Sequence, residues 1–167
     1  MKITREWCMP NSRTFSIKPI GELIQKHAFG KIIDPFANGS KIATVTNDLD
    51  PAYDTDYHMD ALDFLKMFET ESVDTVLYDP PYSARQVAEC YKNLSRTVNM
   101  QTTQSSYWAR QKSEIGRIVR KGGIVITCGW NSGGIGKKHG FEIEEILLVP
   151  HGGWHNDTIV TVEKKIK

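Results

Sequence analysis

The apolar run at residues 73–78, together with the four residues Asp79-Pro80-Pro81-Tyr82 that follow it, constrains the fold more than any other feature of this chain. The run has the composition of a buried strand. The two prolines fix φ and remove backbone donors, so they end the strand in a rigid turn. An acidic and an aromatic side chain are thereby held at the carboxyl end of a buried strand, where open α/β sheets bind their ligands. We therefore predict an α/β fold with a functional site at this turn.

The turn carries the groups that methylation of a base amine requires. An exocyclic amine of adenine or cytosine is a poor nucleophile because its lone pair is conjugated into the ring. The Asp79 carboxylate and the Pro80 carbonyl can accept the two amine hydrogens and localise the lone pair, while Tyr82 can stack on a base lifted from its helix. The predicted catalytic residues are Asp79, Pro80, Pro81 and Tyr82. The structural alternative is a strand that ends in a Pro-Pro turn with Tyr82 packed as a lid.

Two segments upstream of the turn support the catalytic interpretation. Residues 32–40 form a second apolar strand that ends in an acid and a small-residue turn, and residues 18–24 begin an amphipathic helix with Lys-Pro. With these three segments in this order, most of the chain resembles the S-adenosylmethionine-dependent amino-methyltransferases of DNA, which modify adenine and cytosine amines. The resemblance implies a Rossmann-like class I methyltransferase fold, with a mostly parallel seven-stranded sheet whose last strand is antiparallel.

The resemblance also implies a binding site for S-adenosylmethionine as cofactor. In that family the Lys-Pro helix and the Asp-Pro-Phe turn hold the methionine part, and the matching residues are Ile17, Lys18, Pro19, Asp34, Pro35, Phe36, Ala37 and Asn38. Asp48 is expected to accept both ribose hydroxyls, because a carboxylate has two acceptor oxygens, with Asp50 as the competing acid. Asp60, followed by Ala61, is expected to face the adenine part. Asp60 can also simply cap a helix over residues 61–68.

The links after the first and second predicted strands depart from the family pattern. A parallel crossover normally needs a dozen or more residues, but residues 35–43 leave room only for an extended loop, and residues 49–56 are similarly short. One face of the sheet is therefore expected to carry fewer helices than usual. Since parallel sheets are covered on both faces, the bare face should meet the amino-terminal segment, a second copy or a partner, and we expect a homodimer.

Length and composition indicate one domain over residues 1–167, with residues 1–14 as an amino-terminal extension. The chain is 40% hydrophobic and 25% charged, and it shows neither a membrane-length apolar stretch nor a secretory leader. A cytoplasmic protein is expected, in the host cell if the chain is virus-encoded. The three cysteines are widely spread, so we expect neither disulfides nor a metal cluster. His151 and His155 flank Gly152-Gly153, which favours a wide hairpin turn between strands at residues 143–149 and 158–162.

The net charge of +1 gives no strong overall field for nucleic acid, so any basic surface must be local. Basic residues occur around two predicted helices, at residues 86–94 and 105–119, and in a glycine-rich loop after a strand at residues 124–128. Taken residue by residue, solvated helix faces are the better explanation of the first group. Residues 83–106 form either a target-contacting loop or a plain connection. The candidate nucleic-acid contacts are Arg85, Tyr107, Trp108, Arg110, Trp130, Lys137 and Lys138.

These observations predict an adenine-specific DNA methyltransferase that acts on the N6 amine, with DNA a more probable polymer than RNA. The same chemistry on the cytosine amine or on RNA is the first alternative. A non-catalytic subunit with the methyltransferase fold, working in a heteromeric complex, is the second. Methylation of a cytosine ring carbon is disfavoured, because it needs a thiolate nucleophile after a proline and no cysteine here follows one.

Overall fold

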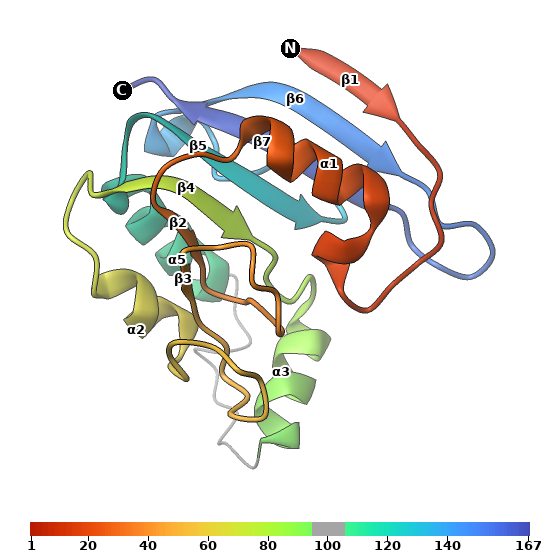
Figure 1. Cartoon of the computed structure of the whole chain (residues 1–167), viewed down its shortest axis with the longest axis horizontal. Coiled ribbons are helices and arrows are strands. Elements are labelled where there is room, and N and C mark those ends of the chain that lie inside the picture. The colour runs from red at the N-terminus through yellow and green to blue at the C-terminus, as the bar shows by residue number, and fades with distance from the viewer. Residues whose placement is uncertain (95–105) are drawn as a thin grey trace.

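The computed structural model describes residues 1–94 and 106–167, which form one seven-stranded sheet with helices on both faces (Figure 1). The strand order is β1-β6-β7-β5-β4-β2-β3, and β7 is antiparallel to both of its neighbours while the other pairs are parallel. This arrangement confirms the predicted α/β fold with an antiparallel last strand. The strands are β1 (Lys2–Arg5), β2 (Ile32–Asp34), β3 (Val45–Thr46), β4 (Val73–Tyr78), β5 (Val119–Gly129), β6 (Phe141–Val149) and β7 (Thr158–Lys165).

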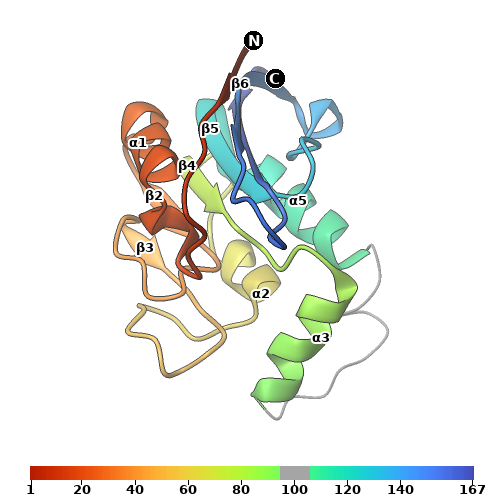
Figure 2. The same cartoon turned by 90° about the vertical axis from the view of Figure 1, so that its right-hand side faces the viewer.

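The helices are distributed unequally between the two faces (Figure 2). Among the described residues, α1 is the only α-helix on its face, whereas α2 and α5 pack together on the other. Helix α3 lies beyond the edge where β4 ends. This confirms that one face carries fewer helices. The helices are α1 (Lys18–His27), α2 (Ala61–Lys66), α3 (Ala84–Asn93) and α5 (Ser106–Ile118), with 3₁₀ turns η1 (Thr14–Ser16) and η2 (Lys137–His139).

Helix α1 is fixed to the sheet by a narrow apolar stripe. Ile20, Leu23 and Ile24 are spaced so that they share one side of the helix, and all three are buried. They belong to the same core cluster as Val160 and Val162 of β7. Each fully buried aliphatic side chain stabilises the fold by about 1.5–3 kcal/mol. The stripe therefore holds the start of α1, including the neighbouring Ile17, against the sheet.

The short links after β2 and β3 contain no helix, as the sequence predicts. Residues 35–44 form turns, and Asn38 adopts a positive φ of 44°. The buried side chain of Asn47 holds the two links together, because its amide donates to the carbonyl oxygens of Pro35 and Met59 at 3.1 and 3.0 Å. Its carbonyl accepts from the Met59 N–H at 2.9 Å. One amide thus replaces the helix packing that usually fixes such links.

The amino-terminal segment extends the sheet at its edge and does not cover a face. Strand β1 pairs in parallel with β6, with Lys2 opposite Glu145 and Ile3 opposite Ile146. The edge of β6 would otherwise present unpaired backbone groups, and β1 satisfies them. The segment predicted only as an extension is therefore an integral strand.

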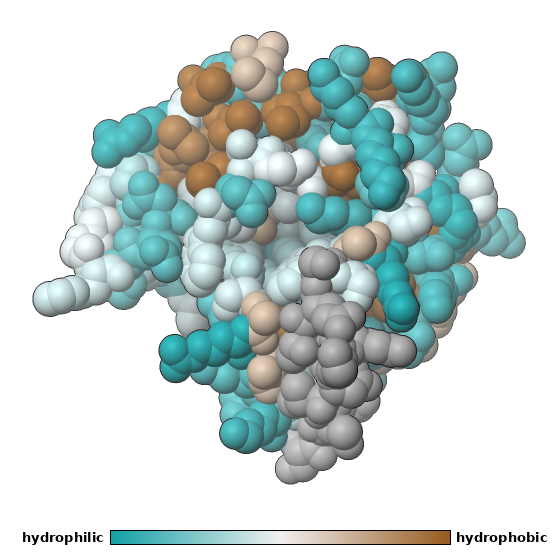
Figure 3. All heavy atoms as spheres, turned by 180° about the vertical axis from the view of Figure 1, so that it is seen from behind, coloured by the Kyte–Doolittle hydropathy of each residue, from teal (hydrophilic) through white to brown (hydrophobic). Residues whose placement is uncertain are grey.

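An exposed apolar surface lies over β1, β6 and β7 on the face opposite to α1, where brown spheres gather in Figure 3. Leu147 belongs to the core beneath α1, so the alternating Ile146 and Leu148 point to the other face. These two side chains are only partly buried, and Ile3 beside them is 58% exposed. This surface lies on the face that carries α2 and α5, not on the face with fewer helices through which the homodimer is expected, and the homodimer stays a prediction. Separately, none of the helices in the described part of the chain is long and apolar enough to cross a membrane.

Glu145 ties β6 to both β1 and α1. Its carboxylate, 5% exposed as a residue, lies 2.9 Å from the Lys26 amine, 2.8 Å from the His27 ring and 3.7 Å from the Lys2 amine. Burial alone would raise the pKa of Glu145, but the hydrogen bonds from Lys26 and His27 and the nearby charges outweigh it and lower the pKa. A lowered pKa means that the charged carboxylate stabilises the folded state above its unfolded-state pKa.

We predict that Glu145→Gln lowers the free energy of unfolding at neutral pH by about 1–3 kcal/mol, because it removes charge-assisted hydrogen bonds. The difference from the native chain should shrink as the pH falls below about 4, where the native carboxylate also becomes protonated. Urea unfolding at several pH values measures both effects. Glu144→Gln is the matched control, since Glu144 lies next in the sequence and forms an exposed pair at 3.9 Å from Lys164. Equal losses in the two variants would contradict the assignment.

Candidate active site

A cavity of about 720 Å³ opens at the edge of the sheet where the parallel strands end. Because β2, β3, β4 and β5 run in parallel, their carboxyl ends meet at this edge. Asp34 ends β2, Asp48 follows β3, Asp79 follows β4 and Trp130 follows β5. Asp48, Asp79 and Trp130 line the cavity directly. The strand order therefore collects residues that lie far apart in the sequence.

The turn after β4 is held rigidly in this cavity. The Tyr82 hydroxyl donates to the Asp79 carboxylate at 2.5 Å, and the Thr14 hydroxyl also hydrogen-bonds to it. The Tyr82 N–H donates to the Gln86 side chain at 2.6 Å, and the Trp108 indole donates to the Pro81 carbonyl at 2.9 Å. The ring of Tyr82 meets the Trp130 ring edge to face, with centroids 5.4 Å apart. Every residue of the predicted catalytic turn from Asp79 to Tyr82 lines the cavity.

Three carboxyl groups lie close together beside the turn, and all three have raised pKa values. Burial raises the pKa of Asp79, although hydrogen bonds from Tyr82 and Thr14 oppose the shift. Burial also raises the pKa of Asp34 well above its usual value, and the charges of Asp79 and Asp48 add to the effect. Asp34 accepts from the Phe36 N–H at 3.1 Å through one oxygen, while its other oxygen is buried without a partner. Such a group of carboxyls favours a cationic ligand.

Asp48 and Asp50 both line the cavity, but they differ in their contacts. Asp48 accepts from the Asn38 N–H at 2.8 Å and from the Asp50 N–H at 2.9 Å, so one carboxylate joins the turns after β2 and β3. Asp50 accepts from the Ala52 N–H at 2.9 Å within its own turn. Burial raises the pKa of Asp48. Asp48 is therefore held in place by two backbone N–H groups at the edge of the sheet where the cavity opens. Its role in binding the ribose stays a prediction.

Asp60 and Ala61 do not line the cavity. Asp60 caps α2, as its sequence position suggests, by accepting from the Leu62 N–H at 3.1 Å. Its other carboxylate oxygen accepts from the Tyr91 hydroxyl, and Tyr91 does line the cavity. Both oxygens of Asp60 thus already accept hydrogen bonds. Tyr91 of α3 lines the cavity, whereas Asp60, which the sequence predicts for the cofactor, does not.

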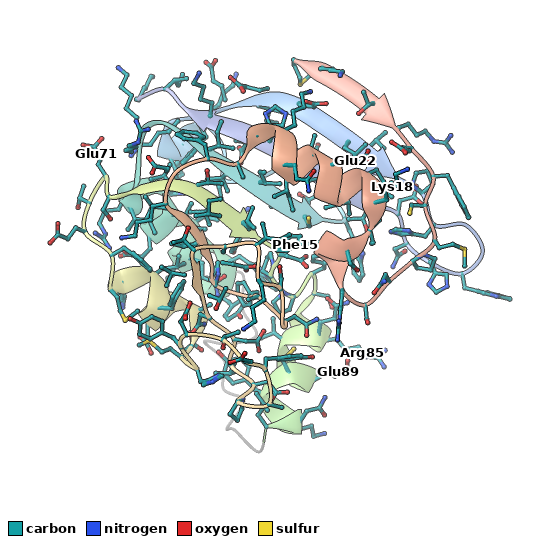
Figure 4. The ribbon with its side chains drawn as sticks, in the orientation of Figure 1. Phe15, Lys18, Glu22, Glu71, Arg85 and Glu89 are labelled. Atoms are coloured by element: carbon teal, nitrogen blue, oxygen red, sulfur yellow. The ribbon has the colours of Figure 1, made fainter. Side chains whose placement is uncertain are left out.

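The remaining residues predicted for the cofactor are divided between the cavity and its surroundings. Ile17, Phe36 and Asn38 line it, and Ala37 lines an adjoining cavity of about 280 Å³ that also contacts Asp79. Pro19 and Pro35 are buried beside these residues. Lys18 lies on the surface of α1, 3.9 Å from Glu22, and does not line either cavity (Figure 4).

The residues predicted to contact nucleic acid are also divided. Tyr107 and Trp130 line the cavity. Trp108 does not line it, but its indole N–H donates a hydrogen bond to the Pro81 carbonyl of the turn. Arg85 pairs with Glu89 along α3 at 3.0 Å (Figure 4). Arg110 is exposed on α5 outside the cavity.

Lys137 and Lys138 lie at the opposite edge of the sheet. They directly precede β6, and β6 begins where β4 and β5 begin, because β7 is antiparallel to both β5 and β6. The loop after β5 begins at the active-site edge, where Trp130 lies, and then crosses to the opposite edge of the sheet. Any phosphate contact of these lysines lies outside this cavity. Of the predicted target loop at residues 83–106, residues 95–105 lie outside the described part of the chain.

Several residues of the cavity carry no signal in the sequence. Segments at residues 10–14 and 151–158 lie at the two ends of the chain, and only the pairing of distant strands brings them to the cavity. The residues found in this way are Pro10, Asn11, Ser12, Thr14, His151, His155, Asn156 and Thr158, together with Glu89, Cys90 and Tyr91 of α3. In the described ranges, no group of three or more His, Cys, Asp or Glu side chains is placed to hold a metal ion.

We predict that Thr14→Val raises the pKa of Asp79 further, because a hydrogen bond to the charged carboxylate favours its ionised form. Valine keeps the shape of threonine and removes only the hydroxyl. The side-chain carboxyl ¹³C shift of Asp79 during a pH titration reports the change. Thr14→Ser keeps the donor and should leave the titration close to that of the native chain. An unchanged titration in Thr14→Val would show that this hydroxyl does not act on Asp79.

No protein-family model and no curated protein sequence matches the chain. Solved structures share its fold. TrmN from Thermus thermophilus has a TM-score of 0.57 at 16% identity over 89% of this chain, which spans about half (48%) of the TrmN chain. The N-methyltransferase NodS from Bradyrhizobium japonicum WM9, in complex with S-adenosyl-L-homocysteine, has a TM-score of 0.52 at 10% identity over 86% of this chain and 82% of its own.

A third structure is the 1,6-didemethyltoxoflavin-N1-methyltransferase of Burkholderia thailandensis, with 1,6-didemethyltoxoflavin and S-adenosylhomocysteine bound. It has a TM-score of 0.53 at 11% identity, and the likeness covers 81% of this chain and 71% of that chain. At these identities the likeness establishes the fold alone. The chain has the Rossmann-like fold seen in structures of methyltransferases, as its sequence predicts.

Proposed function

We propose that the chain is an S-adenosylmethionine-dependent methyltransferase, folded as a single domain, that acts on the N6 amine of adenine in DNA. The observation that carries the proposal is the position of Asp79. Its carboxylate lies at the end of β4 in the cavity, between Tyr82 and Thr14 and next to the acidic group of Asp34 and Asp48. An amine entering this cavity meets a hydrogen-bond acceptor held in a fixed position.

The donor set fits the proposed cofactor. S-adenosylmethionine carries a sulfonium and an ammonium group, and when bound it supplies an electrophilic methyl group. Asp48 and Asp79 line the cavity and are acceptors suited to a cation, whereas Asp34 is fully buried and lines neither cavity. Ile17, Phe36, Ala37 and Asn38 would hold the methionine part, and Asp48 the ribose. The S-adenosylhomocysteine bound in NodS, which has the same fold, supports this choice.

The chain's own residues would act mainly by accepting hydrogen bonds. Asp79 and the Pro80 carbonyl would accept the two hydrogens of the target amine, which localises the nitrogen lone pair. A bound cation would favour the ionised form of Asp79 and so offset the effect of burial on its pKa. The Tyr82 hydroxyl occupies one Asp79 oxygen, and a target amine that takes this same oxygen displaces the hydroxyl. Displacement would free the Tyr82 ring to stack on the base.

Aspartate at position 79 favours adenine by resemblance to the amino-methyltransferases. The same acceptors would also serve the cytosine amine, and RNA is the alternative polymer. A non-catalytic subunit is disfavoured because both Asp79 and Tyr82 are present and hydrogen-bonded in the cavity.

The direct test is methyl transfer from S-adenosylmethionine to double-stranded DNA, single-stranded DNA and RNA, followed by mass spectrometry of the nucleosides. We expect N6-methyldeoxyadenosine, and we expect Asp79→Ala to lower kcat by at least about 100-fold, because a preorganised acceptor acts on the reacting amine. Cofactor affinity should change little. A loss of cofactor binding equal to the loss of activity would instead place Asp79 in the cofactor site.

We predict that Asp48→Ala weakens binding of S-adenosylhomocysteine by about 10- to 100-fold, the effect of losing hydrogen bonds to a charged group. Isothermal titration calorimetry measures the affinity. Asp50→Ala is the matched control, since Asp50 also lines the cavity but bonds within its own turn. A larger loss in Asp50→Ala than in Asp48→Ala would exchange the roles of the two acids.

A further inference from the structure

The amino-terminal segment and the β6–β7 hairpin form one wall of the cavity. Residues 7–12 and 151–158, which we call the target wall, lie side by side (Figure 1). The Cys8 N–H donates to the Pro150 carbonyl at 3.1 Å. His151 joins the two segments, since its Nδ1 lies 2.8 Å from the Cys8 carbonyl and its Nε2 lies 2.8 Å from the Thr158 hydroxyl. Because a carbonyl only accepts, the Nδ1 of His151 carries a proton.

The inner side of the target wall is polar and belongs to the cavity. Asn11, Ser12, His155 and Asn156 line the same space as Asp79. Amide and imidazole groups offer both donors and acceptors, which suits the edges of nucleobases. The wall faces the site where the target base would lie, and nothing in the proposed cofactor site uses these residues.

The outer side of the target wall exposes large aromatic surfaces. Trp154 is fully exposed (101%), Trp7 is 56% exposed and Met9 is 66% exposed. The Trp7 indole nitrogen lies 3.4 Å from the point where a Cβ would stand on Gly152, so the ring lies against the hairpin turn. Trp130, 42% exposed, also lines the cavity. A single exposed apolar residue needs no explanation, but Trp7, Met9 and Trp154 lie together on the two segments that also line the cavity, and such a group marks an interaction site.

The charges of the wall favour stacking over phosphate attraction. Arg5, Glu6 and Arg13 flank the amino-terminal segment, Asp157 lies on the other segment, and all four are exposed. The chain as a whole carries a net charge of only +1. Proteins that bind duplex DNA through its backbone rely on many basic contacts, whereas aromatic rings bind unpaired bases by stacking, at about 1–3 kcal/mol per base.

We propose that the target wall binds single-stranded nucleic acid by stacking unpaired bases on Trp7 and Trp154, next to the base that enters the cavity toward Asp79. The inference rests on the proposed function, because it names the form of the substrate that the same cavity accepts. In a single strand the bases are already unpaired, so no free energy is spent on unpairing them before they stack on an exposed aromatic ring. Recognition of a duplex would require these rings to meet paired bases that are already stacked on one another.

The test measures binding of a fluorescein-labelled oligodeoxyadenylate, the corresponding duplex and an oligoadenylate RNA by fluorescence anisotropy, with S-adenosylhomocysteine present. We expect tighter binding of single strands than of the duplex and only a weak dependence on salt. Trp154→Ala and Trp7→Ala should each weaken single-strand binding by about 5- to 100-fold, as the loss of one stacked base implies. Trp154→Phe keeps a stacking ring and should retain most of the affinity.

Met67→Ala is the matched control, because Met67 is 44% exposed after α2 and does not line the cavity. Trp154 is fully exposed, so its replacement should leave the melting temperature and S-adenosylhomocysteine binding unchanged. Duplex binding as tight as single-strand binding, or tryptophan variants that bind like the native chain, would overturn the proposal. Equal binding of DNA and RNA strands, each lost in Trp154→Ala, would support it for both polymers.

The two proposals fail in distinguishable ways. If methyl transfer occurs on duplex DNA and is unaffected in Trp7→Ala and Trp154→Ala, the target wall is wrong while the proposed function stands. If single strands bind through the tryptophans but no substrate is methylated, the proposed function is wrong while the wall stands. A protein partner that competes for Trp154 without any binding of single strands would also reject the wall as a nucleic-acid surface.

Discussion

Two neighbouring carboxyl groups at the ends of adjacent parallel strands, Asp34 fully buried and Asp79 partly buried, are the constraint on which the rest of the site depends. Strand β2 pairs with β4, so Asp34 and Asp79 come close together, and burial raises the pKa of both. Burying such groups costs free energy unless a partner compensates the charge. The fold therefore keeps a local arrangement that does not serve stability, which is typical of a site built for a ligand. Thr14, Tyr82 and the Phe36 N–H offset part of that cost.

The sequence was most informative where local patterns decide the structure. The strands at the edge, the start of α1, the cap at Asp60 and the helix-free links all follow from short-range features that the residues carry themselves. The apolar stripe of α1 and the prolines after β4 act within one or two turns of chain. Asp34, Asp48 and Asp79 could be predicted in the same way, because each ends or closely follows a strand.

The rest could not be predicted, because it depends on contacts between distant residues. His151 bonds to the carbonyl of Cys8 at the other end of the chain, and no periodicity announces such a pair. Lys137 and Lys138 follow a loop that begins at the cavity, yet the loop crosses the sheet before they occur. The sequence suggests that Tyr82 stacks on a target base. In the structure its hydroxyl instead donates a hydrogen bond to Asp79, and its ring packs edge to face against Trp130. Contacts of this kind between side chains form only when the whole fold has assembled, so the sequence pattern does not reveal them.

The pairing of β1 with β6 also determines the order in which the molecule can be completed. Lys2 of β1 lies opposite Glu145 of β6, so β1 cannot pair during synthesis until β6 has been made. Contacts of such long range close late, because the chain must pay the loop-closure entropy before it gains the pairing. The strands that carry the three acids can assemble earlier, as they lie close together in the sequence. The acidic cleft can thus form before the target wall that faces it, because the wall needs residues 151–158 as well as the amino-terminal segment.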